Sequence, residues 1–222
     1  GRVYWKEKMK IKSSIGADVF PLFPIPLYTN NLNRPFHKHE HECFGNVLQR
    51  MKHNEGNLIS ENSFVLNDER LSDLKNWIQS CIDDYFNTII CSSEDFEPYV
   101  TISWLNYAEE KQYHHQHDHS NSIISGVLYI DADEMTDNIT FHKNTYNSSP
   151  YINLKPSQYN LYNSENWSVS VQKQKLILFP STLKHSVSNL TSNKTRISLS
   201  FNVFVKGVVG DVNNKTFLEL GN

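Results

Sequence analysis

Four histidines and one aspartate fall within a run of seven residues, YHHQHDH, at positions 113–119. His117 and His119 are two residues apart, so in an extended strand both side chains project to the same side and could bind one metal ion. His115 and His117 have the same spacing and form an alternative pair. Neutral imidazole is a good ligand for ferrous iron, zinc, copper and nickel. The run therefore predicts a metal site.

A third ligand and a cationic side chain follow far downstream. His185 is the last histidine of the chain, and it comes after the apolar segment 176–180, which is typical of a buried strand. A third imidazole would close one face of a metal ion and leave other positions open, as an oxygenase requires. Arg196 begins another apolar segment, and its guanidinium can bind a carboxylate through two parallel hydrogen bonds. Ser198, on the same strand face, could add a hydroxyl hydrogen bond, so this layout indicates a non-haem iron site with a keto-acid co-substrate.

The acidic residue of the run, Asp118, is adjacent to His117 rather than two positions away. In an extended strand its side chain would face away from that of His117, which favours His119 as the second ligand. A β-bulge could instead turn Asp118 inward, and it remains the alternative to His119.

A second histidine cluster, made of His37, His39 and His41, lies near the N-terminus. No distant partner for it is visible in the sequence. We expect these residues at the solvated start of a helix rather than in a second metal site.

The elements that must position these residues change in character along the chain, and the part before about residue 92 looks helical. Apolar residues at three- and four-residue steps predict a helix over 40–52 and a second helix whose apolar stripe runs from Leu71 to Tyr85. Asn67 is the expected N-cap of the second helix, with Asp68 and Glu69 in its first turn. The proline-rich segment 20–26 is predicted to be extended, either on the core or along a sheet edge.

Beyond Pro98 the pattern becomes that of short strands separated by polar loops. We predict strands at 99–107, 123–131, 138–141, 168–171, 175–179, 185–187 and 195–205. Many such strands favour a sandwich or barrel. Together with the earlier helices, they predict a mainly β protein: a jelly-roll, cupin-like core buttressed by N-terminal helices.

The length suits one domain over residues 1–222. We expect it to divide into an N-terminal tail (1–18), a mainly helical support (19–97), the jelly-roll core (98–206) and a C-terminal tail (207–222). The polar insertion 143–167 is long for a loop inside a compact domain, which is typical of a lid or a mobile loop.

Composition excludes several classes of protein. The formal net charge is -3, so no large basic field is present to attract nucleic acid. No apolar run approaches the roughly 18 residues of a membrane span, and no signal sequence is visible. The cysteines, Cys43, Cys81 and Cys91, are odd in number and fit no disulfide or zinc spacing, so we expect reduced thiols in the cytoplasm.

With these residues in view, the sequence resembles the iron(II)- and 2-oxoglutarate-dependent dioxygenases. The similarity runs from about Phe20 to Val205 and is strongest towards its C-terminal end. It is carried by the histidine run and by Trp104–Asn106, Ser125–Tyr129, Leu178–His185 and Arg196–Asn202. The branch that it resembles is poorly characterised and occurs in bacteria and marine phages, so the resemblance suggests the cytoplasm of a bacterial or phage-infected cell.

The resemblance implies a double-stranded β-helix that uses ferrous iron (Fe2+), dioxygen (O2) and 2-oxoglutarate to oxidise a substrate, most simply by hydroxylation. His117 and His185 match iron-binding positions. Arg196 matches the residue that pairs with the distal carboxylate of 2-oxoglutarate, and Ser198 the hydroxyl beside it. The resemblance also suggests two further co-substrate contacts, Tyr129 and Asn106. The wider family has His-X-Asp/Glu, so a ligand set with His119 would carry one negative charge fewer and should alter metal affinity and redox potential.

Two other functions compete with this one. A three-histidine site also suits cupin-like dioxygenases that use no keto acid, although Arg196 argues against them. In a non-catalytic jelly-roll binding module the histidines would be unrelated in space. The sequence names no substrate, which could be a small molecule or a protein, and it predicts no oligomeric state.

Overall fold

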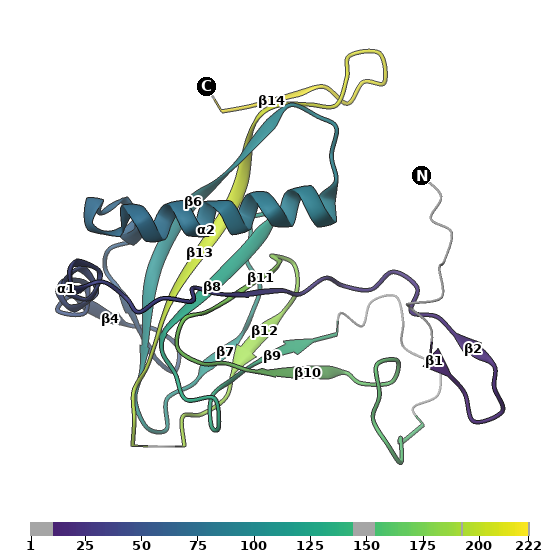
Figure 1. Ribbon diagram of the computed structural model, residues 1–222, viewed down its shortest axis with the longest axis horizontal. Coiled ribbons are helices and arrows are strands. Elements are labelled where there is room, and N and C mark those ends of the chain that lie inside the picture. The colour runs from purple at the N-terminus through teal and green to yellow at the C-terminus, as the bar shows by residue number, and fades with distance from the viewer. Residues whose placement is uncertain (1–10, 144–153, 192, 222) are drawn as a thin grey trace.

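The computed structural model describes residues 11–143, 154–191 and 193–221 and contains two large antiparallel β-sheets (Figure 1). The major sheet has the order β3 (Tyr28–Asn31), β11 (Lys175–Pro180), β8 (Ile124–Asp131), β13 (Arg196–Val209), β6 (Phe96–Ala108), β5 (Leu58–Ser60) and β4 (Met51–His53), and β14 (Leu218–Leu220) pairs with β13. The minor sheet has the order β10 (Asn166–Ser170), β9 (Asn138–His142), β12 (His185–Val187) and β7 (His114–His117).

From β6 onwards the chain passes back and forth between the two sheets. The strands β6, β8, β11 and β13 belong to the major sheet, and β7, β9, β10 and β12 to the minor sheet. This alternation is the topology of a double-stranded β-helix, or jelly roll, and it confirms the predicted fold class.

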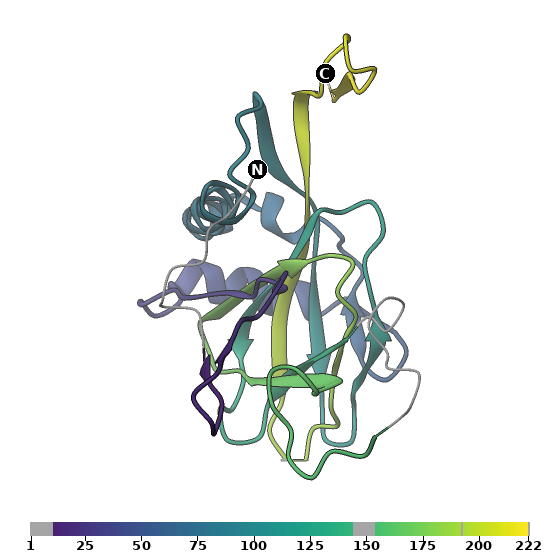
Figure 2. The same cartoon turned by 90° about the vertical axis from the view of Figure 1, so that its right-hand side faces the viewer.

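The helices cover the outer face of the major sheet. Helix α2 (Ser72–Tyr85) lies across β6, β13 and β8, and α1 (Lys38–Val47) lies beside it (Figures 1 and 2). The predicted apolar stripe of α2 is buried at Leu74, Ile78, Cys81, Ile82 and Tyr85. Within the described ranges, no helix combines the length and the apolar character needed to cross a membrane.

Strand β8 shows how alternation along a strand builds two separate cores. Leu128 and Ile130 belong to the core between the major sheet and the helices, whereas Val127 and Tyr129 belong to a smaller core between the two sheets. At Gly126 an added Cβ would overlap the ring of Phe201, so only glycine fits there. The second core is the one that surrounds the candidate site.

The predicted helix limits need two corrections. The first helix ends at Val47 rather than at residue 52, because residues 48–50 form a turn and Met51 begins β4, which pairs with β5. The second helix begins at Ser72, and Asn67 is not its N-cap. Two short 3-10 turns, η2 (Val65–Asn67) and η3 (Glu69–Leu71), precede it, and the side chain of Asp68 accepts a hydrogen bond from the Arg70 N–H.

The N-terminal third contains more extended structure than predicted. The strands β3, β4 and β5 lie there, as does a separate hairpin of β1 (Ile11–Lys12) and β2 (Asp18–Val19) that stands away from the two sheets (Figure 1). The proline-rich segment 20–26 does not lie on the core, since Leu22 is 65% exposed and Phe23 94% exposed. The segment that does pair along the sheet edge is β3, just after it.

All seven predicted strands are present; β12 has the predicted ends, and the ends of the other six are shifted. Strand β7 was not predicted as a separate strand. Strand β13 continues into the expected C-terminal tail. There Val208 and Val209 pair with Glu219 and Leu218 of β14. Of the insertion 143–167, residues 144–153 lie outside the described part of the chain. Residues 154–165 contain neither helix nor strand.

Candidate metal centre

Two neighbouring strands of the minor sheet bring His117 and His185 together. The two residues are direct partners in the pairing of β7 with β12, and their ring centroids are 4.3 Å apart. His119 follows the end of β7, and its ring centroid lies 5.0 Å from that of His117 and 5.2 Å from that of His185. One candidate ligand atom from each of the three residues lies within 4.8 Å of the others.

Main-chain carbonyl groups orient two of these rings. Nδ1 of His117 lies 2.8 Å from the carbonyl oxygen of His115, and Nδ1 of His185 lies 3.1 Å from that of Leu183. A carbonyl oxygen only accepts hydrogen bonds, so Nδ1 must carry the hydrogen in both rings. In a neutral imidazole the other nitrogen, Nε2, then keeps a free lone pair with which to bind a metal.

Burial keeps the three imidazoles neutral. Desolvation, with repulsion from His117 as the next cause, lowers the pKa of His185 to about 2 and the pKa of His119 to about 4. The pKa of His117 is also lowered, mainly by burial. Since neutral imidazole is the form that coordinates metals, all three side chains can act as ligands at neutral pH.

The alternatives from the histidine run are not brought to this point. Asp118 is exposed and is not part of the three-residue group, so no bulge turns it inward. His115 contacts Glu55 at the protein surface, with its Nδ1 3.9 Å from the carboxylate. The histidines of the second cluster are exposed at the start of α1, as predicted, and within the described residues they form no metal-binding group.

A pocket between the two sheets extends from the three histidines to Arg196. It is lined by every predicted co-substrate contact, namely Asn106, Tyr129, Arg196 and Ser198. On β13, Arg196 and Ser198 face into the pocket because alternate residues of a strand share a face. Their partners in the ladder are Ala108 and Asn106 on β6. One pocket therefore contains both the candidate metal ligands and a cation.

Asn106 provides a test of whether a carboxylate would fit this pocket. Its Nδ2 donates to Ser200 Oγ at 2.8 Å and to Ser198 Oγ at 3.4 Å, while its buried Oδ1 has no partner. Rotating the amide by 180° lets both hydroxyls donate to Oδ1 and leaves the NH2 group to donate elsewhere. A carboxylate in the pocket would satisfy that donor, so these residues fit a keto acid.

Arg196 already has a carboxylate partner within the protein. Its Nη1 donates to Asp137 Oδ1 at 2.9 Å, and both side chains are buried. Nη2 faces the main-chain oxygen of Ser188 at 3.5 Å. Tyr129 is also buried, and desolvation raises its pKa, so its hydroxyl stays protonated as a donor.

Sequence reasoning assigned no definite role to three residues of this region. Asp137 is one of several acids in the stretch 131–137, and nothing in its spacing marks it. His114 lines the pocket and stacks on His117 with a centroid distance of 4.3 Å, and burial lowers its pKa to about 3. Trp104 lines the pocket near His119, at 5.8 Å between ring centroids. For His114 the signal was its place in the histidine run.

Comparison with known proteins adds family information to this geometry. Residues 102–202 match a family model described as "Putative 2OG-Fe(II) oxygenase", and this segment contains all the candidate ligands and pocket contacts named above. A search of curated proteins finds no match.

Several proteins of solved structure have a fold similar to that of this chain. One is the non-heme alpha ketoglutarate dependent carbocyclase SnoK from nogalamycin biosynthesis (TM-score 0.56, 11% identity, covering 88% of this chain and 87% of SnoK). Another is a Pseudomonas putida prolyl-4-hydroxylase (TM-score 0.50, 12% identity, covering 80% and 92%). A third is HygX from Streptomyces hygroscopicus with nickel, 2-oxoglutarate and hygromycin B bound (TM-score 0.52, 8% identity, covering 81% and 82%). At these identities the likeness shows a shared fold.

Proposed function

We propose that this chain is an iron(II)- and 2-oxoglutarate-dependent oxygenase that hydroxylates its substrate. The match of residues 102–202 to the 2OG-Fe(II) oxygenase family model supports the proposal. In the reaction, one oxygen atom of O2 enters the substrate as a hydroxyl group. The other enters 2-oxoglutarate, which loses CO2 and leaves as succinate. The cofactor of the family is ferrous iron.

One observation carries the proposal: the candidate ligand atoms of His117, His119 and His185 meet within 4.8 Å in a pocket that also contains Arg196. Two of these residues come from strands that are far apart in the sequence. A binding module without a metal would have no reason to bring neutral imidazoles together out of water, because burial of polar groups without a partner is unfavourable.

Each group in the pocket has a part in this proposal. His117 and His185 would hold the iron through Nε2, and His119 through one of its ring nitrogens. The bound iron would supply the activation of dioxygen. Arg196 and Ser198 would bind the distal carboxylate of 2-oxoglutarate, with Asn106 and the Tyr129 hydroxyl as further donors. The apolar side chains between the sheets, among them Phe179, would keep water out of the reaction.

The proposal predicts that changing His185→Ala removes the metal and the activity together. We expect bound iron per protein to fall by about tenfold or more, because one of three ligands is lost, and succinate formation from 2-oxoglutarate to fall with it. Iron content is measured by elemental analysis and succinate by chromatography. The matched control, His39→Ala, removes an exposed histidine of α1 and should change neither. Unchanged iron content in His185→Ala would contradict the proposal.

A second function is favoured by one specific observation. Because Arg196 already pairs with Asp137, the pocket could serve a three-histidine dioxygenase that uses no keto acid. The same assay separates the two. Tight iron binding with no succinate from any pool of substrates would favour the second function.

The substrate that we propose is a small molecule or a protein residue rather than nucleic acid, since the chain carries a net charge of -3. We propose the cytoplasm as its compartment. In support of this, Cys43, Cys81 and Cys91 are all free thiols.

A further inference from the structure

We infer that Asp137 is a positioning residue, which holds the guanidinium of Arg196 in the orientation that seats the distal carboxylate of the co-substrate. The inference rests on the proposed function, in which Arg196 binds 2-oxoglutarate. Nothing in the spacing of the sequence pointed to Asp137, which lies 59 residues before its partner.

The ion pair is enclosed by the protein. The side chains of Arg196 and Asp137 are 7% and 2% exposed, and Nη1 and Oδ1 are 2.9 Å apart. A guanidinium buried alone would have to be desolvated without compensation, and it would be free to turn about its side-chain bonds. A carboxylate on one edge removes both problems and leaves other N–H groups of the same plane available.

Asp137 is itself held on three sides by main-chain hydrogen bonds. Its Oδ2 accepts from the Asp133 N–H at 2.8 Å, and its own N–H donates to the Asp133 carbonyl at 2.7 Å. Its carbonyl accepts from the Val171 N–H at 3.1 Å. These contacts use every polar group of Asp137 except Oδ1. They fix the orientation of the carboxylate, and Oδ1 faces Arg196.

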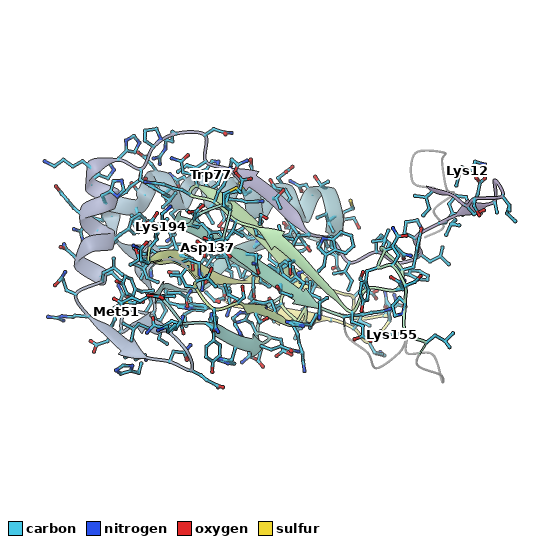
Figure 3. The ribbon with its side chains drawn as sticks, turned by 90° about the horizontal axis from the view of Figure 1, so that it is seen from below. Lys12, Met51, Trp77, Asp137, Lys155 and Lys194 are labelled. Atoms are coloured by element: carbon cyan, nitrogen blue, oxygen red, sulfur yellow. The ribbon has the colours of Figure 1, made fainter. Side chains whose placement is uncertain are left out.

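The turn that carries Asp137 is also tied to the start of β13. Lys194 Nζ lies 2.6 Å from Asp133 Oδ2, only two residues before Arg196. Asp137 and Lys194 lie close to one another in Figure 3, at the same end of the two sheets. The turn 133–137 and the beginning of β13 therefore form one unit that sets the position of the guanidinium.

This arrangement predicts an effect that is specific for dicarboxylic keto acids. If Asp137 only orients Arg196, its loss should weaken the binding of a ligand whose carboxylate pairs with Arg196. The affinity for a ligand that coordinates only the metal should stay unchanged. 2-Oxoglutarate is a ligand of the first kind. Pyruvate has the same keto-acid group but no distal carboxylate, so it is of the second kind.

The experiment titrates 2-oxoglutarate and pyruvate separately into the manganese-loaded protein by calorimetry. For Asp137→Asn we expect the dissociation constant of 2-oxoglutarate to rise about tenfold or more, the scale of a lost charge-assisted hydrogen bond, and that of pyruvate to stay unchanged. Asp137→Ala should show the same pattern. The matched control, Glu134→Gln, changes an exposed acid in the same turn, and it should behave as the wild type.

Three outcomes would overturn the inference. An unchanged or lower dissociation constant for 2-oxoglutarate in Asp137→Asn would show that the carboxylate does not position Arg196 or competes with the ligand. Equal weakening of both keto acids would show a general structural role. A wild-type protein that binds 2-oxoglutarate no more tightly than pyruvate would contradict the proposed function itself, and the positioning role with it.

Discussion

Protonation of the histidines is set by the immediate surroundings of each ring, and this has a consequence for stability. The pKa of His185 is lowered by burial to about 2, below the value of about 6.5 expected in the unfolded chain. The unfolded state therefore takes up a proton as the pH falls below 6.5 while the folded state does not. The stabilisation is complete above pH 6.5 and is lost progressively as the pH falls from there towards the folded-state pKa.

We therefore predict that the metal-free protein loses thermal stability between pH 6.5 and 5.5, above the range in which most carboxylates titrate. For His185 alone the loss is about 1.4 kcal/mol over that pH unit at most. The unfolding temperature of metal-free protein is measured at both pH values. His185→Asn, which cannot take up a proton, should flatten the dependence, and an equally steep dependence in that variant would disprove the assignment.

Among the elements, β8 is packed on both faces, so its side chains cannot become larger without displacing their neighbours. An added methyl group at Gly126 would overlap Phe201 and contact Leu178 closely. We predict that Gly126→Ala destabilises the protein by roughly 1–3 kcal/mol, the usual range for overpacking a core. Denaturant unfolding measures this change.

The chain offers a matched control for that substitution in α1. Gly45 has no atom within 4 Å of an added Cβ, and alanine is the better helix former. Gly45→Ala should leave stability unchanged or raise it by up to about 1 kcal/mol. If both variants behaved alike, close packing at Gly126 would not explain its requirement for glycine.

Elements whose limits were mispredicted share a physical cause. The end of α1 and the start of β4 depend on pairing between β4 and β5, and the start of α2 depends on the Asp68 side chain capping a 3-10 turn. The apolar periodicity of a helix can continue through such positions, so the sequence pattern does not reveal that a strand pairing or a side-chain cap ends the helix there. The apolar stripe of α2 was predictable because it needs only local spacing.

On the scale of the whole molecule, a metal at the candidate site would join two distant parts of the chain. His117 and His185 belong to β7 and β12, which pair within the minor sheet, and the major sheet closes the pocket on its other side. A metal that binds only the folded form stabilises it by about 2.7 kcal/mol when its concentration is 100 times the dissociation constant.

We thus predict that manganese raises the unfolding temperature of the wild type by several degrees, since about 1 kcal/mol corresponds to roughly 2–4 °C for a protein of this size. Differential scanning fluorimetry with and without the ion measures the shift. His185→Ala should show no shift, whereas His39→Ala should shift like the wild type. A full shift in His185→Ala would place the metal elsewhere.

By itself, the sequence determined the types and spacing of the candidate ligands, the strand that presents Arg196 and Ser198 on one face, and the two-layer fold with its helical cover. These properties follow from local rules, namely the alternation along strands and the three- to four-residue period of helices. Only the tertiary structure decided that His119 rather than Asp118 joins the group, that His114 stacks on His117, and that Asp137 pairs with Arg196. The physical reason is that these contacts join residues far apart in the sequence and depend on how the sheets pack and how the loops are placed. No local sequence pattern specifies which buried charged groups will pair.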